Sequence, residues 1–165
     1  MAQSAALFQG MHHVAVSVPD LAIARRFYID LLGATEVSTL DWGEGNAMIN
    51  AIVGLPDSAA RVFLARLGNT YIEVFEYLTP RSPAQAPDRP VNLYGYTHIC
   101  LQVADIQAVY ARLVEAGIRF HTPPQGGDVD AEGRKTGFIA TYGRDFFGNV
   151  FELIEINADS DIRPL

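Results

Sequence analysis

The sequence contains very little cysteine and no long hydrophobic run. Cys100 is the single cysteine among 165 residues, so no disulfide can form within the chain and a reducing compartment is expected. No apolar run approaches the roughly 18 residues that span a bilayer. The stretch MAQSAALFQG at the start has neither a basic segment nor a long apolar core, unlike a signal peptide. These absences predict a cytoplasmic protein with no membrane partner.

Basic residues are also scarce. Twelve Lys and Arg against 19 Asp and Glu give a formal net charge of -7, and the basic residues form no dense run. Nucleic acid is therefore not an expected partner, and a small-molecule substrate is. Hydrophobic residues make up 49% and charged residues 19% of the chain, which is ordinary globular composition. The length suits one domain, or two small modules that share a core.

The chain contains an internal repeat. Residues 10–24, GMHHVAVSVPDLAIA, align with residues 95–109, GYTHICLQVADIQAV, at a constant offset of 85. This alignment makes His13 equivalent to His98, whereas His12 has no histidine counterpart. The repeat thus predicts two modules of similar structure.

A second match lies at the far end of each half. The segment LGNTYIEVFEY, from Leu67, resembles FGNVFELIEI, from Phe147. Glu73 is equivalent to Glu152 after a shift of one residue. Both halves therefore run in the same order, which is a strand, a helix, further strands, a Gly-Asn turn and a last strand.

Periodicity and end signals predict the elements. Asp20 and Asp105 stand at helix N-cap positions, and Gly33 and Gly117 stand where the two helices should end. Helices are expected at 20–32 and 105–116, and strands at 12–18, 34–41, 61–67, 70–78, 97–103, 118–121, 136–142 and 149–156.

The segments between these elements define the predicted organisation. Residues 79–94 hold four of the nine prolines and should form a stiff spacer. Residues 122–136 are rich in Gly, Pro and charge and predict an exposed, mobile loop, either a plain connection or a lid. The pattern of residues 44–58 does not distinguish between helix, strand and loop. The expected parts are an N-terminal extension at 1–10, a first module at 11–78, a linker at 79–94, a second module at 95–157 and a tail at 158–165.

Four residues stand out as candidate metal ligands. Strand alternation puts His13 and His98 on the strand faces opposite the aliphatic residues that should meet the helices. Glu73 and Glu152 each share a strand face with apolar side chains, where a carboxylate is costly unless it is paired. One divalent cation bound by all four residues would explain both the two histidines and the two glutamates. Imidazole nitrogen and carboxylate oxygen suit Zn, Ni, Co, Mn or Fe(II).

Three neighbouring residues receive other roles. His12 should point away from the face that carries His13 and be partly exposed. Cys100 shares a face with His98, from which it can reach the cavity, but a small buried hydrophobe is the expected role. His121 has no partner in the repeat, which indicates a structural or pocket-lining role.

Four segments together resemble the vicinal oxygen chelate superfamily. They are HHVAVSVPDLAIARRFYIDLLG, GNTYIEVFEY, YTHICLQVADIQAVYARLVEAG and FFGNVFELIE, and the resemblance covers about 11–157. The superfamily includes glyoxalase I, methylmalonyl-CoA epimerase, extradiol dioxygenases and the bleomycin and fosfomycin resistance proteins. The resemblance implies an α+β fold of two βαβββ modules in tandem, forming a curled sheet around a metal-containing cleft. It also implies a homodimer, with the cleft formed within or between chains.

The resemblance implies that His13, Glu73, His98 and Glu152 bind the metal. Extradiol dioxygenases have no ligand at the place of Glu73, and resistance proteins that only sequester a drug lack most ligands. The full set therefore favours a metal-dependent isomerase, epimerase or lyase of the glyoxalase type that stabilises the enolate of a small carbonyl substrate. Glu152 is the first candidate base and Glu73 the second.

Two other functions stay open, an Fe(II)-dependent extradiol-type dioxygenase and a non-catalytic small-molecule binding or resistance protein. The first module carries an additional stretch, about 42–60, which can reshape a pocket, and Glu44 within it is a further candidate base. No basic cluster suits coenzyme A or glutathione. The scattered basic candidates are Arg61, Arg66, Arg134, Lys135 and Arg144. The candidate pocket aromatics are Tyr71, Phe75, Tyr77, Tyr94, Tyr96 and Tyr142.

Overall fold

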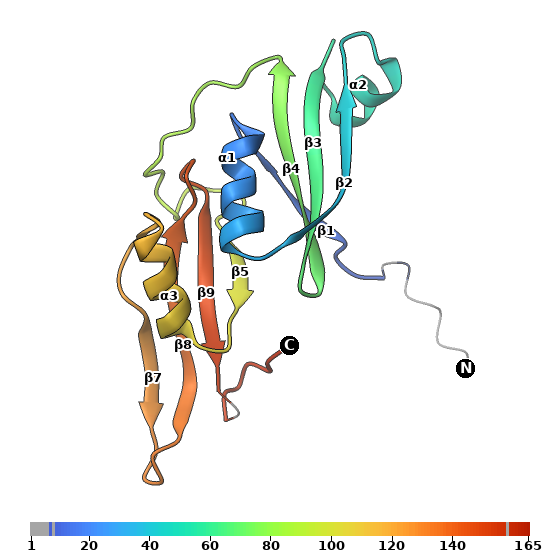
Figure 1. Ribbon diagram of the computed structural model, residues 1–165. Helices are drawn as coiled ribbons and strands as arrows, with labels where there is room; N and C mark the ends of the chain where they lie inside the picture. Colours follow the sequence, from blue (N-terminus) through green and yellow to red (C-terminus); the bar gives the residue numbers. More distant parts are fainter. Residues whose placement is uncertain (1–6, 8, 158) are drawn as a thin grey trace, which may run out of the picture. The chain divides into compact units, whose positions relative to one another are not determined.

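The computed structural model describes residues 7, 9–157 and 159–165, and it divides into two compact units, Met1–Pro83 and Ala84–Leu165. The expected extension at 1–10 lies mostly outside the described residues. Each unit combines one β-sheet with a helix on one of its faces, as the predicted α+β class requires (Figure 1). Among the described residues, no helix is long and apolar enough to cross a membrane.

The first unit contains a four-stranded sheet in the order β1-β4-β3-β2. Its elements are β1 (His13–Ser17), α1 (Leu21–Arg25), the π-helical turn η1 (Arg26–Leu31), β2 (Thr35–Trp42), α2 (Ala47–Val53), β3 (Ala59–Leu67) and β4 (Thr70–Thr79). The first strand, β1, runs parallel to the last strand, β4, and the other pairs are antiparallel. The first and last strands of the unit are therefore neighbours.

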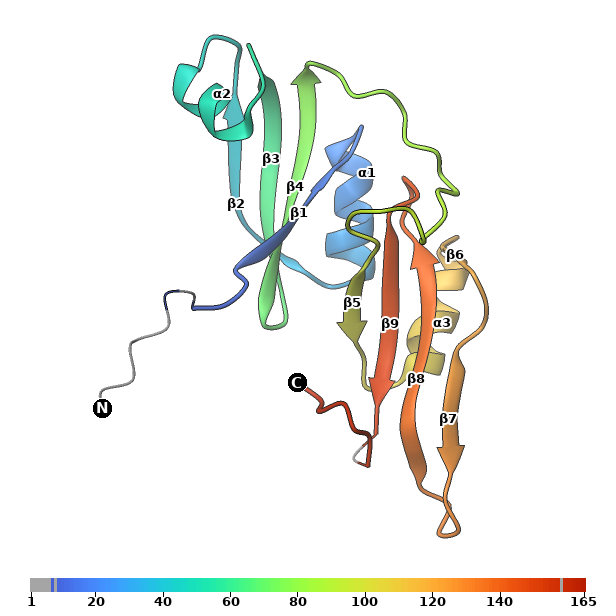
Figure 2. The ribbon, with the colours of Figure 1, turned by 180° about the vertical axis from the view of Figure 1, so that it is seen from behind.

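The second unit repeats this arrangement. Its elements are β5 (Ile99–Gln102), α3 (Ile106–Glu115), β6 (Arg119–Phe120), β7 (Gln125–Val129), β8 (Lys135–Arg144) and β9 (Val150–Ile156). Its sheet has the order β5-β9-β8-β6, and β7 also pairs with β8 (Figure 2). Again the first strand, β5, is parallel to the last, β9, and the other pairs are antiparallel. The two short strands β6 and β7 together occupy the edge that β2 alone occupies in the first unit.

Most of residues 122–136 are exposed, as predicted, but the prediction of a loop was wrong, because β7 forms a hairpin with β8 there. The glycines that indicated a loop are what permits the pairing. Gly126 has a φ of +95°, and a Cβ at this position would lie 2.7 Å from the backbone oxygen of Phe138. Asp130 stabilises the turn, since its carboxylate accepts hydrogen bonds from the backbone N–H groups of Glu132 and Arg134.

Residues 44–58, which the sequence left unassigned, contain α2. Asn46 caps this helix by accepting a hydrogen bond from the N–H of Ile49. Ser58 then ties the helix to the sheet, because its hydroxyl donates to Asn50 and accepts from the indole N–H of Trp42. The additional stretch of the first module therefore contains a helix that is hydrogen-bonded to the sheet through Ser58.

The predicted helix starts are confirmed. The carboxylate of Asp20 accepts hydrogen bonds from the N–H groups of Ala22 and Ile23, at 2.7 and 3.0 Å. Asp105 accepts from Ala108 at 3.0 Å. The first predicted helix continues from α1 into the π-helical turn η1 before it ends ahead of Gly33.

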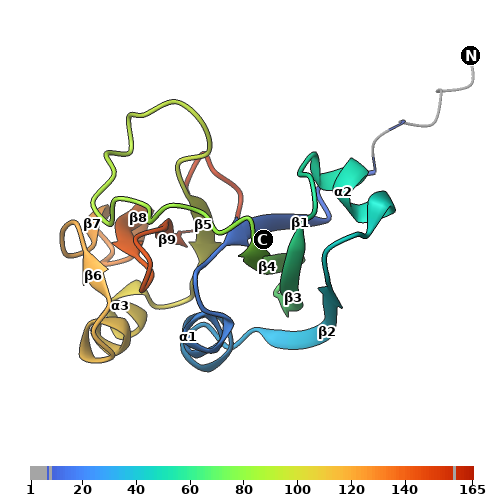
Figure 3. The same cartoon turned by 90° about the horizontal axis from the view of Figure 1, so that it is seen from above.

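The helices pack on the aliphatic sides of the sheets, as predicted. Figure 3 shows α1 on one face of the first unit's sheet and α3 on one face of the second unit's sheet. On β1, Val14 and Val16 are half-buried whereas His13 and Ala15 are exposed. The largest fully buried side chains include Phe27, Tyr28, Phe63 and Val74 in the first unit and Ile106, Leu113, Phe151 and Leu153 in the second.

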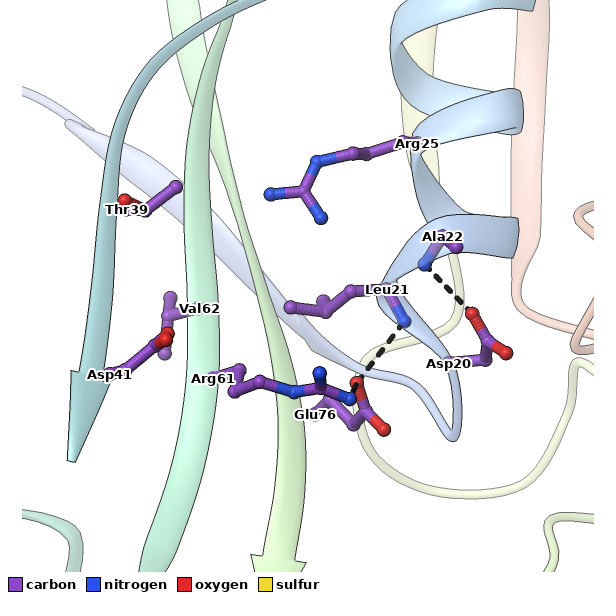
Figure 4. A pocket seen from close by; sticks show the side chains of 9 residues that line it. All are labelled: Asp20, Leu21, Ala22, Arg25, Thr39, Asp41, Arg61, Val62 and Glu76. Atoms are coloured by element: carbon purple, nitrogen blue, oxygen red, sulfur yellow. Dashed lines mark hydrogen bonds and ion pairs between the residues drawn. The ribbon is translucent and has the colours of Figure 1, made fainter. Parts of the chain in front are cut away.

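Each helix also meets a buried carboxylate on the last strand of its unit. In the first unit, Glu76 of β4 is 7% exposed, accepts a hydrogen bond from the N–H of Leu21 at 3.4 Å and pairs with Arg61 at 2.8 Å (Figure 4). In the second unit, Glu155 of β9 is 5% exposed and accepts from the N–H of Ile106 at 2.8 Å.

Lys135 pairs with Glu155 at 2.8 Å. Each carboxylate thus satisfies the first backbone donor of its helix and is itself neutralised by a neighbouring cation.

We predict that Glu155→Ala lowers the free energy of unfolding by about 2 kcal/mol, because a charge-assisted hydrogen bond is lost and the N–H of Ile106 is left without its acceptor. Urea denaturation measures this change. Glu132→Ala removes an exposed carboxylate of the same unit and should have little effect. Equal stability of Glu155→Ala and the wild type would contradict the assignment.

The same carboxyl group predicts a pH dependence. Burial raises the pKa of Glu155, but the hydrogen bond from Ile106 and the charge of Lys135 outweigh it, and the pKa lies below its ordinary value of 4.5. A pKa lowered in the folded state stabilises the protein fully above the unfolded pKa, and this contribution is lost as the pH falls through the folded pKa. The stability difference between wild type and Glu155→Gln, measured by urea denaturation from about pH 7 to about pH 3, should therefore shrink in acid. A difference that grows in acid would refute this.

Candidate functional site

Each unit brings one predicted histidine against one predicted glutamate. In the first unit, Nε2 of His13 lies 3.3 Å from Oε2 of Glu73, and these two residues are called the first pair. In the second unit, Nε2 of His98 lies 3.1 Å from Oε2 of Glu152, and these are called the second pair. The repeat in the sequence is thus a repeat of a side-chain contact.

The parallel pairing of the first and last strands produces both contacts. In the first unit, Ala15 of β1 is in register with Glu73 of β4, so His13 lies two residues along on the same face. In the second unit, Cys100 of β5 is in register with Glu152 of β9, and His98 directly precedes β5. Side chains at such diagonal positions are within reach of one another.

The four side chains are partly enclosed. The exposed fractions are 39% for His13 and 26% for Glu73, against 25% for His98 and 16% for Glu152. Both pairs are therefore shielded from full hydration but open to a ligand, and the second pair is the more enclosed.

Aromatic residues surround the first pair. The half-buried rings of Tyr71, Phe75 and Tyr77 lie on the same strand face as Glu73. Phe75 and Tyr77 stack with ring centroids 5.7 Å apart, and Trp42 meets both edge-on. Burial, and then the charge of Glu73, raise the pKa of Tyr77, so its phenol stays protonated beside the carboxylate.

Tyr142 and Cys100 accompany the second pair. The ring of Tyr142 lies 4.7 Å from that of His98, and its strand position is in register with Glu152. Burial, followed by the charges of Glu152 and Cys100, raises the pKa of Tyr142. Tyr142, Tyr94 and Tyr96 were all candidate pocket aromatics. Tyr142 lies beside the second pair, but the prediction was wrong for Tyr94 and Tyr96, which are fully exposed.

The prediction that Cys100 is a buried hydrophobe was wrong, because the residue is exposed. Its sulfur is nevertheless partly desolvated. This desolvation, with the hydrogen bond to Glu152 and the charge of that carboxylate, raises the pKa of Cys100 to about 12. The side chain therefore contributes a neutral thiol beside the second pair.

The residue His12 is exposed, as predicted, but the predicted orientation of its side chain was wrong. Its ring does not turn away from His13, since Nδ1 of His12 lies 2.9 Å from Nδ1 of His13. The ring stacks on Tyr71 with centroids 4.9 Å apart. Strand β1 begins only at His13, so strand alternation does not apply to the residue before it.

The other candidates have structural partners or lie apart. His121 accepts a hydrogen bond from Nε of the buried Arg144, and burial, then the charge of Arg144, lower the pKa of this histidine. Arg144 also donates to the backbone oxygens of Arg89 and Gly148. Glu44 is exposed in the turn before α2. Arg134 pairs with Asp130 in the β7–β8 turn.

A hollow of about 380 Å³ lies on the other face of the first sheet, between the start of α1 and β2, β3 and β4 (Figure 4). It is lined by Arg25, Asp41, Arg61 and Glu76 among others, and it includes none of the four predicted ligands. Because Arg25 pairs with Glu36 and Arg61 pairs with Glu76, its cations are already neutralised. This hollow is not the predicted site.

Each pair offers one nitrogen and one oxygen to a metal. Within either unit, the described residues gather no group of three or more His, Cys, Asp or Glu side chains fit to hold an ion. Each unit therefore supplies two of the four predicted ligands, which is fewer than a structural or catalytic metal site normally has.

The sequence comparisons place these observations among known proteins. The model of the Glyoxalase/Bleomycin resistance protein/Dioxygenase superfamily matches residues 10–153. The chain is 33% identical over 109 residues to the mitochondrial methylmalonyl-CoA epimerase of Mus musculus, covering 66% of this chain and 54% of that protein. It is 32% identical over 146 residues to the ethylmalonyl-CoA/methylmalonyl-CoA epimerase of Cereibacter sphaeroides, covering 88% of this chain and 97% of that protein. The match thus spans about half of the mouse protein but nearly all of the bacterial one.

Solved structures show the same fold. A glyoxalase family protein from Bacillus cereus superposes with a TM-score of 0.76 at 24% identity, covering 94% of this chain and 99% of that one. The fosfomycin resistance protein FosX from Listeria monocytogenes, in complex with Mn(II) and sulfate, superposes with a TM-score of 0.57 at 15% identity, covering 92% and 96%.

We predict that Cys100 reacts with iodoacetamide roughly tenfold to a hundredfold more slowly than an ordinary thiol at about pH 8, because its low thiolate fraction outweighs the higher reactivity of a basic thiolate. Glu152→Gln removes the neighbouring charge and should speed alkylation in metal-free protein. Mass spectrometry measures the rate without interference, since the chain has one cysteine. Glu115→Gln, which changes an exposed carboxylate of α3, serves as the control. Equal rates for both variants would contradict the contact between Cys100 and Glu152.

Proposed function

Because the chain belongs to the Glyoxalase/Bleomycin resistance protein/Dioxygenase superfamily, we propose that it is a metal-dependent epimerase or related isomerase acting on the carbon next to a carbonyl group. The observation that carries the proposal is the duplicated His–Glu contact, at 3.3 Å in the first pair and 3.1 Å in the second. We propose that His13, Glu73, His98 and Glu152 together bind one divalent ion.

The donor set fits such an ion. Two imidazole nitrogens and two carboxylate oxygens suit Zn, Ni, Co or Mn. Each pair is in direct contact and partly enclosed, so its nitrogen and oxygen lie close enough together to bind the same ion. A bound divalent ion would supply Lewis-acid stabilisation of the negative charge that develops on the substrate's carbonyl oxygen.

The side chains around the pairs have separate roles in the proposal. In the proposal, Glu152, the more enclosed carboxylate, takes the proton from the carbon next to the carbonyl, and Glu73 is the group that returns a proton. Tyr142 and Tyr77 are neutral phenols beside these carboxylates and can donate hydrogen bonds to a substrate oxygen. Trp42, Phe75 and Tyr77 form an apolar wall that excludes water.

The relatives indicate which substrates to test. The Cereibacter sphaeroides and Mus musculus relatives are named for epimerisation of methylmalonyl-CoA, and the former also for ethylmalonyl-CoA. A relative from Actinomyces sp, 32% identical over 123 residues that cover 70% of this chain and 63% of that protein, is a 2-epi-5-epi-valiolone epimerase. On the names of these relatives, and without a basic cluster in the chain that suits coenzyme A, we propose an acyl thioester of a 2-substituted malonate as the first substrate class and a cyclic polyhydroxy ketone as the second.

The metal ligands can be tested by elemental analysis of the purified, untagged protein. We predict stoichiometric Zn, Ni, Co or Mn in the wild type and loss of that metal in Glu73→Ala. Glu44→Ala removes an exposed carboxylate of the first unit and should retain the metal. Iron that survives Glu73→Ala would contradict the proposal and favour oxygen chemistry. Absence of metal from the wild type, even after reconstitution, would also overturn it.

The reaction can be tested by deuterium exchange. In D₂O the wild type should incorporate deuterium at the carbon next to the thioester carbonyl of methylmalonyl-CoA or ethylmalonyl-CoA, or next to the ketone of a valiolone. Glu152→Gln should slow the exchange by roughly 10²- to 10⁴-fold, the usual contribution of a general base. Metal content measured on the same sample separates loss of the base from loss of the ion. Wild-type exchange in a metal-loaded Glu152→Gln protein would exclude Glu152 as the base.

A further inference from the structure

The residue before each candidate ligand histidine contacts the far side of its ring. In the first unit, Nδ1 of His12 lies 2.9 Å from Nδ1 of His13. In the second unit, Oγ1 of Thr97 lies 2.9 Å from Nδ1 of His98. Both ring nitrogens of each candidate ligand are therefore engaged, Nε2 by the glutamate of the pair and Nδ1 by the preceding residue.

The repeat makes these two contacts equivalent. At the offset of 85 that aligns His13 with His98, His12 aligns with Thr97. The two side chains differ in size, shape and ring character. Each nevertheless places at hydrogen-bond distance from Nδ1 an atom that can accept a hydrogen bond from an N–H group there.

That shared property matters for metal binding. A neutral imidazole carries one proton, so Nε2 can present a lone pair to a metal only when the proton is on Nδ1. An N–H at Nδ1 is stabilised by an acceptor, and ligand histidines commonly have such a partner. The carboxylates favour the opposite tautomer, because Glu73 and Glu152 each face Nε2 at 3.3 and 3.1 Å.

We infer that His12 and Thr97 are positioning residues that hold His13 and His98 in the tautomer with the proton on Nδ1 and the lone pair on Nε2. This inference rests on the proposed function, since it assigns both histidines to the metal. Nδ1 of His12 accepts the hydrogen bond in the first unit, and the hydroxyl of Thr97 accepts it in the second.

His12 is held firmly enough for this role. Its ring stacks on Tyr71 with an interplanar angle of 15°. Its backbone oxygen accepts hydrogen bonds from the N–H of Tyr71 and the hydroxyl of Thr70, at 3.2 and 3.1 Å. Both the main chain and the ring of His12 are thus fixed against the start of β4.

The test uses two matched pairs of variants. His12→Phe keeps an aromatic ring on Tyr71 but removes the acceptor, whereas His12→Thr provides the hydroxyl found at the equivalent place in the second unit. Thr97→Val removes the hydroxyl with little change of shape, whereas Thr97→Ser keeps it. His12→Phe and Thr97→Val should lose the positioning effect, whereas His12→Thr and Thr97→Ser should retain it.

The first readout is made on metal-free protein. Long-range ¹H–¹⁵N spectra of the imidazole rings at about pH 8, above the ordinary titration range of histidine, report which nitrogen carries the proton. We expect His13 in His12→Phe and His98 in Thr97→Val to shift toward the tautomer protonated on Nε2. His12→Thr and Thr97→Ser should match the wild type.

The second readout is the affinity for Mn(II) alone, measured by calorimetry. His12→Phe and Thr97→Val should each bind about 10- to 100-fold more weakly than the wild type, as is usual when the partner of a ligand histidine is removed. Wild-type tautomers and wild-type Mn(II) affinity in both variants would overturn the inference. If the wild type binds no metal, the proposed function fails, and the tautomer spectra still decide the inference: a shift supports it and no shift refutes it.

Discussion

The parallel pairing of the first strand with the last in each unit is the constraint on which the rest of the structure depends. It places β1 beside β4 and β5 beside β9. Each last strand then presents two carboxylates three positions apart, which point to opposite faces of the sheet. Glu73 meets a histidine on the open face, and Glu76 meets the start of α1 on the helix face. One strand therefore both builds the candidate site and anchors the helix.

Much of this arrangement could be predicted because it is repeated in the sequence. The alignment of His13 with His98 and of Glu73 with Glu152 singled out the residues that the structure brings into contact within each unit. The caps at Asp20 and Asp105 were likewise readable, since a short acidic side chain before an apolar helical pattern has few other roles.

The parts of the structure that could not be predicted involve sequence features that are compatible with two different structures. Glycine indicates a loop by its freedom but also permits close strand approach, so β7 at Gly126 was missed. Alternation holds only inside a strand, so the side chain of His12 was misplaced. Glu76 and Glu155 were overlooked although the same repeat contains them, because a carboxylate is not expected on the side of a strand that faces a helix. Its role becomes clear only when the unpaired N–H groups at the start of the helix are considered.

The spacing of the two carboxylates also limits how the chain can change in length. Inserting one residue between Glu73 and Glu76 would turn both side chains to the same face of the sheet. Either the start of the helix or the histidine would then be left without its carboxylate. The two halves differ by one residue between the Gly-Asn turn and the first glutamate, with five positions from Gly68 to Glu73 and four from Gly148 to Glu152, yet both keep three from the first glutamate to the second. The extra residue of the first unit lies in the first part of β4, ahead of Glu73, so the length difference leaves the spacing between the two glutamates unchanged.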